Sequence, residues 1–256
     1  AGENDGMQRD DWYTTHRDAA QLEDPLRVGR IAAERAVARL GGRKVSTGDF
    51  PVLFEATLAG GLLGSLVHAA SGGALYRKAS FLVDHLGKRV LPEFVNISER
   101  PHIRCGLGSA PFDSDGVATR EREVVSGGIL QGYFLSAYTA RKLGMQTTGN
   151  AGGSHNLIIE PGEMGLDGLL KTMGRGLLVT ELLGHGINYV TGDYSRGAAG
   201  FWVEDGRIAH PVEEITIAGN LKAMLAGIVA VGNDVLVRGS KQTGSILVDR
   251  MTVAGE

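Results

Sequence analysis

Apolar residues at a spacing of three or four predict two helices in the first quarter of the chain. The first follows Asp24, which can cap a helix, and has Pro25 in its first turn; its apolar positions are Val28, Ala32, Ala36 and Leu40. The second is predicted over residues 56–70 and contains Gly60, Gly61 and Gly64. Because glycine lowers helix stability by about 1 kcal/mol relative to alanine, we expect this helix to pack very closely against another element.

Shorter apolar runs bounded by glycine and aspartate predict strands and a few short helices. The predicted strands cover residues 50–54, 117–125, 129–135, 177–183, 246–248 and 251–253. Residues 201–208 predict a hairpin with an Asp205-Gly206 turn, and helices are predicted over residues 136–143, 166–173 and 221–229. Since helices and strands do not alternate regularly, we expect an α+β fold with a largely antiparallel, barrel-like sheet and packed helices.

The composition of the chain argues against several functional classes. The chain has 256 residues and a formal net charge of -3, and its basic residues are scattered, so direct binding to nucleic acid is not expected. Its single cysteine, Cys105, excludes an internal disulfide and a cysteine-rich zinc module. No apolar run approaches the roughly 18 residues of a membrane span, and the polar, acidic start is unlike a signal peptide. These features predict a cytoplasmic protein without a membrane contact.

Common catalytic motifs do not occur in the sequence. None of the seven histidines lies three, four or five residues from another, so no helix carries a pair of histidine metal ligands. Cys105 has His102 nearby in sequence, which leaves a cysteine-dependent hydrolase as one alternative, although a lone cysteine is usually an inert packing residue.

Residues 191–202 combine Asp193 and Arg196 with three glycines and three aromatic residues. Two interpretations remain open. The segment is either a bulged turn with a local salt bridge between Asp193 and Arg196, or a loop lining a cleft in which glycine lets a peptide backbone approach closely.

Several long segments resemble the TldD/PmbA family, and most closely its PmbA (TldE) branch. They cover residues 71–82, 110–117, 148–156, 191–204, 214–221 and 231–234. The resemblance extends over nearly the whole chain. It implies that residues 1–45 are the remnant of the family's N-terminal domain and that residues 46–256 form its C-terminal domain.

The resemblance also implies a function, that of a cytoplasmic peptidase with two kinds of subunit. The TldD branch holds zinc with a His-Glu-x-x-x-His helix and a cysteine from a later loop, and the glutamate acts as general base. The PmbA branch forms a heterodimer with it and helps enclose the substrate channel. An unfolded or leader peptide would be held through its backbone by strand addition.

When the family's metal motif is placed on this sequence residue by residue, its ligand positions are occupied by residues that cannot bind a metal. Gly64 stands at the first histidine, Ser65 at the glutamate and Ala69 at the second histidine, and the loop at residues 239–244 contains no cysteine. His68 falls one position short, which rotates its side chain by about 100° on a helix. We therefore expect no metal in this chain and zinc in a TldD-type partner. The family motifs supply these substrate-binding candidates: Ser71, Asn150, Gly152, Gly153, His155, Asp193 and Arg196.

The leading hypothesis is a PmbA/TldE-type subunit of a zinc-dependent peptidase complex that is not catalytic on its own. A second hypothesis is a non-enzymatic interaction protein that modulates a topoisomerase or a toxin system, because the family is also called a modulator of DNA gyrase. The third is the independent hydrolase based on Cys105.

Overall fold

The computed structural model describes residues 1–3 and 6–255. Its helices are α1 (Pro25–Ala38), α2 (Ala56–Ala69), α3 (Gly72–Tyr76), α4 (Ala137–Leu143), α5 (Leu166–Met173) and α6 (Leu221–Ala226), with a 3-10 turn at Ala19–Gln21. The strands are β1 (Gly2–Glu3), β2 (Gly6–Met7), β3 (Gly48–Phe54), β4 (Ile97–Glu99), β5 (Arg122–Ser126), β6 (Ile129–Leu130), β7 (Leu157–Ile159), β8 (Gly176–Leu183), β9 (Asp193–Glu204), β10 (Arg207–Asn220), β11 (Ile228–Val231), β12 (Lys241–Gln242) and β13 (Ile246–Ala254).

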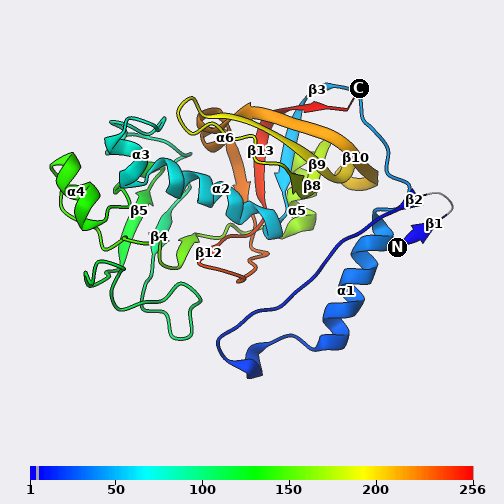
Figure 1. Ribbon diagram of the computed structural model, residues 1–256. Coiled ribbons are helices and arrows are strands. Elements are labelled where there is room, and N and C mark those ends of the chain that lie inside the picture. Colours follow the sequence, from blue (N-terminus) through cyan, green and yellow to red (C-terminus); the bar gives the residue numbers. More distant parts are fainter. Residues whose placement is uncertain (4–5, 256) are drawn as a thin grey trace.

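The main sheet closes into a ring. Its strands follow the order β10-β9-β8-β3-β13-β11, and β13 also pairs with β10, where Ile217 lies opposite Val253. Only the β3–β8 pair in this sheet is parallel, so the predicted α+β fold with a largely antiparallel, barrel-like sheet is confirmed. A second sheet, ordered β12-β7-β4-β5-β6, lies beside the ring, and α2 runs between the two (Figure 1).

At the end of β3 both faces of the ring are buried, each against a different helix. In β3, Val52 and Phe54 belong to the main core with α2, whereas Leu53 belongs to a second core with α5. All three side chains are fully buried. This explains why β3 is a continuous apolar run rather than an alternating one, because a strand covered on both faces needs no polar side.

Most of the predicted elements are present, and the errors have physical causes. Residues 221–229 do not form one helix, because α6 ends at Ala226 and β11 begins at Ile228 to pair with β13. The strands predicted at 117–125 and 129–135 correspond to β5 and β6, which are shorter than predicted. The predicted strands at 246–248 and 251–253 are one strand, β13, with an irregularity between Val248 and Met251 in its pairing with β3.

The interpretation of residues 191–202 as a turn or loop is wrong, because β9 begins at Asp193 and is a long strand. Its glycines serve the sheet itself: a Cβ at Gly200 would lie 1.9 Å from the carbonyl oxygen of Leu178 on β8. Glycine here allows two strands to approach closely at a bulge. The proposed salt bridge is also not formed. Asp193 accepts a hydrogen bond from Thr191 Oγ1 at 2.6 Å instead.

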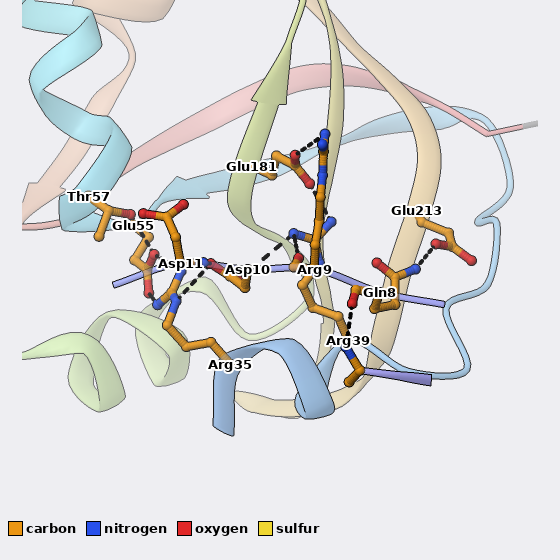
Figure 2. Close-up of polar contacts among 11 residues, drawn as sticks. Gln8, Arg9, Asp10, Asp11, Arg35, Arg39, Glu55, Thr57, Glu181 and Glu213 are labelled. Carbon is orange, nitrogen blue, oxygen red and sulfur yellow. Dashed lines mark hydrogen bonds and ion pairs between the residues drawn. The ribbon is translucent and has the colours of Figure 1, made fainter. Parts of the chain in front are cut away.

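The first part of the chain is attached to the ring and to α2 by a network of ion pairs. Arg35 of α1 donates to both carboxylate oxygens of Glu55, at 2.7 and 2.9 Å, and to Asp10 at 3.2 Å (Figure 2). Arg39, which directly follows α1, pairs with Glu181 of β8. Burial lowers the pKa of Arg35, but the two carboxylates outweigh it and raise the pKa above its ordinary value. Because Glu55 directly precedes α2, this network fixes the start of that helix.

No helix in residues 1–3 and 6–255 is both long enough and apolar enough to span a bilayer.

Candidate functional site

Helix α2 contains the positions of the family's metal motif, and contacts at both of its ends and along one side hold it in place. Its first amide, that of Ala56, donates to Ser245 Oγ at 3.0 Å. Leu62, Leu63 and Leu66 are buried in the main core and hold one side of the helix. The C-terminal end stops at Ala69, after which Ser71 caps α3 by accepting from the amide of Ala74.

The other side of α2 is open, which contradicts the expectation of close packing at its glycines. A Cβ added at Gly61 would meet no atom within 4 Å. At Gly60 it would lie 3.9 Å from Lys241, and at Gly64 the nearest atom would be Lys241 Cε at 3.6 Å, which is an ordinary van der Waals contact. The bare face of α2, defined as Gly60, Gly61 and Gly64, is therefore not required by packing among the described residues.

A first cavity, the Arg196 pocket, lies between this helix and the ring and has a volume of about 280 Å³. From α2 it is lined by Thr57, Leu58, Gly61, Leu62 and Ser65. The facing residues are Phe54 of β3, Leu182 of β8, Tyr194 and Arg196 of β9, and Ile187 of the connecting loop. The pocket thus combines one cation and three hydroxyl groups with several apolar side chains.

The polar groups of this pocket are incompletely paired. Nε of Arg196 is buried without a hydrogen-bond partner among the described residues, and one terminal nitrogen donates to the carbonyl of Leu182 at 3.4 Å. Tyr194 is 4% exposed. Burial raises the pKa of Tyr194, although the positive charge of the adjacent Arg196 acts against that shift. The hydroxyl therefore stays protonated at neutral pH.

A second cavity, the Lys241 pocket, lies against the same helix and has a volume of about 320 Å³. It shares Thr57 and Gly61 with the Arg196 pocket. Its other residues come mainly from the segment 236–241, together with Ala56, Gly60 and Tyr13 of the N-terminal segment. Arg238 lies 3.8 Å from the centre of the Trp12 ring and 4.5 Å from that of Tyr13, so the N-terminal segment helps to build this wall.

The residues present at the motif positions do not fit a zinc ion. Ala69 is fully buried and carries no ligand atom, Ser65 donates to the carbonyl of Gly61, and Gly64 faces the side chain of Lys241. The part of the chain that the structure describes contains no group of three or more His, Cys, Asp or Glu placed to hold a metal. A lysine beside the first ligand position also opposes a divalent cation electrostatically. His68 is exposed and stacks on Tyr189, with ring centres 3.9 Å apart.

Asn150 and His155, two of the substrate-binding candidates, belong to a buried structural network. Glu99, 1% exposed, accepts from Arg122 at 2.7 Å, from Asn150 at 2.8 Å and from the amide of His155 at 2.6 Å. Arg122 in turn reaches Asn150 Oδ1 at 3.1 Å. The network joins β4, β5 and the loop before β7, and its polar atoms are occupied by one another.

The remaining candidates lie in different places. Gly152 and Gly153 have φ values of 102° and 118° in the same loop as Asn150, where they form its turn. Ser71 is the cap of α3. Asp193 is exposed and bonds to Thr191 and Asn220. Of the seven candidates, Arg196 is the one that lines a cavity against α2.

Sequence reasoning missed Glu99, Tyr194 and Lys241. Tyr194 could have been found from its spacing of two from Arg196, had the segment been assigned as a strand, because alternate residues share a face. Glu99 and Lys241 have no local signal. Cys105 is exposed, and the ring of the neighbouring His102 contacts Thr119 at 3.1 Å.

Comparisons with known proteins agree on one family. Residues 47–255 match the model of the PmbA/TldA metallopeptidase C-terminal domain. The chain is 51% identical to a metalloprotease PmbA homolog of Haemophilus influenzae over 255 residues, covering 99% of this chain and 56% of that protein. It is also 51% identical to the metalloprotease PmbA of Escherichia coli O157:H7, covering 100% and 57%.

A crystal structure from Bacteroides thetaiotaomicron, described as a candidate modulator of DNA gyrase, superposes with a TM-score of 0.91 at 32% identity. The match covers 96% of this chain and 55% of that one. The chain thus spans little more than half the length of the relatives it matches. The division predicted between residues 45 and 46 stays a prediction.

Proposed function

The chain belongs to the PmbA/TldD metallopeptidase family, and from that membership we propose that it is a PmbA/TldE-type subunit of a zinc-dependent peptidase complex. In this proposal a TldD-type partner in a heterodimer supplies the zinc. This chain binds no metal and forms part of the wall along which an unfolded or leader peptide lies, in the cytoplasm.

The bare face of α2 is the observation that carries the proposal. One of its residues, Gly64, stands at the first position of the family's metal motif and carries no ligand atom, and the face remains open beside two cavities. Helix glycines that no internal contact requires are costly, so a role in contact with something outside the chain accounts for them. A peptide backbone is suited to such a surface because it needs close approach without a specific side chain.

The chemistry available on this chain is binding and orientation. Hydroxyl groups of Thr57, Ser65 and Tyr194 and the guanidinium of Arg196 can hold polar groups of a peptide, and the leucines of α2 and β8 can contact its side chains. Holding the peptide in one orientation would lower the entropic part of the barrier for hydrolysis by the partner.

A reconstitution experiment tests the proposal. Full-length protein, a TldD-type partner and their mixture are incubated with an unstructured peptide, and cleavage is followed by mass spectrometry. We expect robust cleavage by the mixture only, abolished by a chelator and restored by zinc. A partner variant without its metal ligands is the matched control and should inactivate the mixture. Chelator-sensitive cleavage by this protein alone would refute the assignment of a non-catalytic subunit.

The alternative is a non-enzymatic interaction protein, and the description of the Bacteroides thetaiotaomicron relative as a candidate modulator of DNA gyrase favours it. Co-purification with a topoisomerase, in the absence of a TldD-type partner, would support this second function over the first.

A further inference from the structure

The arginines of this chain differ in how their charge is balanced. Arg35, Arg39 and Arg122 are largely buried, and each forms an ion pair with a carboxylate, those of Glu55, Glu181 and Glu99 respectively. Arg196 is half-buried, yet no carboxylate of residues 1–3 and 6–255 forms an ion pair with it. A guanidinium in this position has lost part of its hydration, and a bound anion would offset that loss.

The cavity around Arg196 has space for such an anion. None of the described residues that line it is Asp or Glu. The Nε–H of Arg196 has no acceptor among the described residues, and the hydroxyls of Tyr194 and Thr57 also line the cavity. A carboxylate is planar and accepts two parallel hydrogen bonds from a guanidinium, which makes it the natural complement.

The apolar residues that line the pocket indicate which kind of carboxylate ligand it can bind. Phe54, Leu58, Leu62, Leu182 and Ile187 share the cavity with the arginine. The last residue of a peptide presents a carboxylate and a side chain from the same Cα, so both halves of the lining would be used. An internal Asp or Glu has its carboxylate at the tip of its side chain and offers nothing to the apolar half. The volume of about 280 Å³ lies just below the roughly 300–1,000 Å³ of pockets for drug-sized ligands, which suits one terminal residue.

We propose that the Arg196 pocket binds the C-terminal carboxylate of a peptide whose last residue is apolar. Arg196 holds the carboxylate, the hydroxyl of Tyr194 lies in the same pocket, and the leucines of α2 and β8 contact the terminal side chain. The side of α2 that lines this pocket thereby becomes part of an anion-binding site. The ligand class rests on the proposed function, but the site is tested by binding alone, without partner or metal, so failure of binding and failure of the peptidase complex are separate results.

The test compares two fluorescently labelled, unstructured peptides that end in leucine, one as the free acid and one as the amide. Full-length protein is titrated into each, and anisotropy gives the dissociation constants. A hydrogen bond to a charged group increases affinity by roughly ten- to hundredfold. We expect the acid to bind more tightly than the amide by that factor. Equal affinities for acid and amide would overturn the proposal without any variant being made.

Two variants and a third peptide locate the effect. Arg196→Met should reduce the affinity for the acid to that for the amide, while Lys241→Met, which removes a charge in the neighbouring pocket, should leave the ratio unchanged. Loss of the ratio in Lys241→Met but not in Arg196→Met overturns the assignment to this pocket. An amide peptide ending in glutamate should bind as weakly as the leucine amide. If it binds as tightly as the acid, the site recognises a side-chain carboxylate and the assignment to the chain terminus is wrong.

Discussion

Replacing Gly61 by alanine tests whether the bare face of α2 is kept for something outside the chain. Gly61 is exposed and lies in the interior of the helix, and a Cβ there meets no atom within 4 Å. An added methyl group therefore costs no steric energy in the folded chain. It also removes backbone freedom from the unfolded chain, which favours folding.

The expected gain follows from helix propensity. Glycine is less favourable than alanine by roughly 0.5–1 kcal/mol in a helix interior, so Gly61→Ala should stabilise the protein by about that amount. For a chain of this size, the melting temperature should rise by about 1–4 °C. Thermal unfolding by circular dichroism and urea titration measure the two quantities.

Gly29→Ala is the matched control. Gly29 is also an exposed glycine within a helix, α1, and also has no atom within 4 Å of an added Cβ, but it lines neither of the two pockets. Both variants should be stabilised, whereas only Gly61→Ala should slow peptide cleavage by the reconstituted complex. If Gly61→Ala lowers the melting temperature while Gly29→Ala raises it, the face of α2 is packed and the reasoning fails. Equal cleavage rates for the two variants would refute the functional part.

Three further predictions concern the scaffold. Glu99→Gln should destabilise the protein by about 3 kcal/mol in urea titrations, because it leaves Arg122 buried without a counter-charge; a loss below about 1 kcal/mol would mean that water replaces the carboxylate. Burial raises the pKa of Asp113, but three backbone N–H donors outweigh it and hold the pKa below the usual range. Its contribution to stability is therefore present above the unfolded pKa of about 3.9 and is lost as the pH falls through the lower folded value. The stability advantage of the wild type over Asp113→Asn should shrink as the pH falls below about 5, and an advantage independent of pH would contradict this. Gly200→Ala should lower the melting temperature and cost about 1–3 kcal/mol or more, because its methyl would overlap a carbonyl of β8; an unchanged melting temperature would contradict the close strand approach.

The sequence predicts the helices best where local signals agree with tertiary packing. Asp24 with Pro25 marks the start of α1, and Ser136 starts α4 with a capping box. These signals are local side-chain hydrogen bonds, so they can be read without knowledge of the fold. The sequence predicted a barrel-like sheet but not its strand pairings, because a pair such as β3 with β13 joins segments far apart in the sequence.

The candidate site was predicted less well, for a related reason. The glycines of residues 191–202 indicate a turn when read locally, but in the structure they allow β8 and β9 to lie close together. Asn150 and His155 were selected as substrate-binding candidates, whereas Glu99 of β4 holds both in a buried network. In each case the deciding partner lies on a distant segment that no spacing rule reveals.

The closed ring determines how this domain can meet other chains. A sheet with a free edge can extend by backbone hydrogen bonds to almost any extended chain, which is also the usual beginning of aggregation. Here β13 covers β10 at Thr216–Ala218, and the segment at Arg43 pairs with β10 at Val212. These pairings interrupt the outer edge of β10, so no long continuous stretch of it is left as a template, and the short β11 is the only strand of that sheet outside the ring among residues 1–3 and 6–255. Where the strands are paired in this way, recognition depends on side chains, which can discriminate between ligands where a bare strand edge cannot.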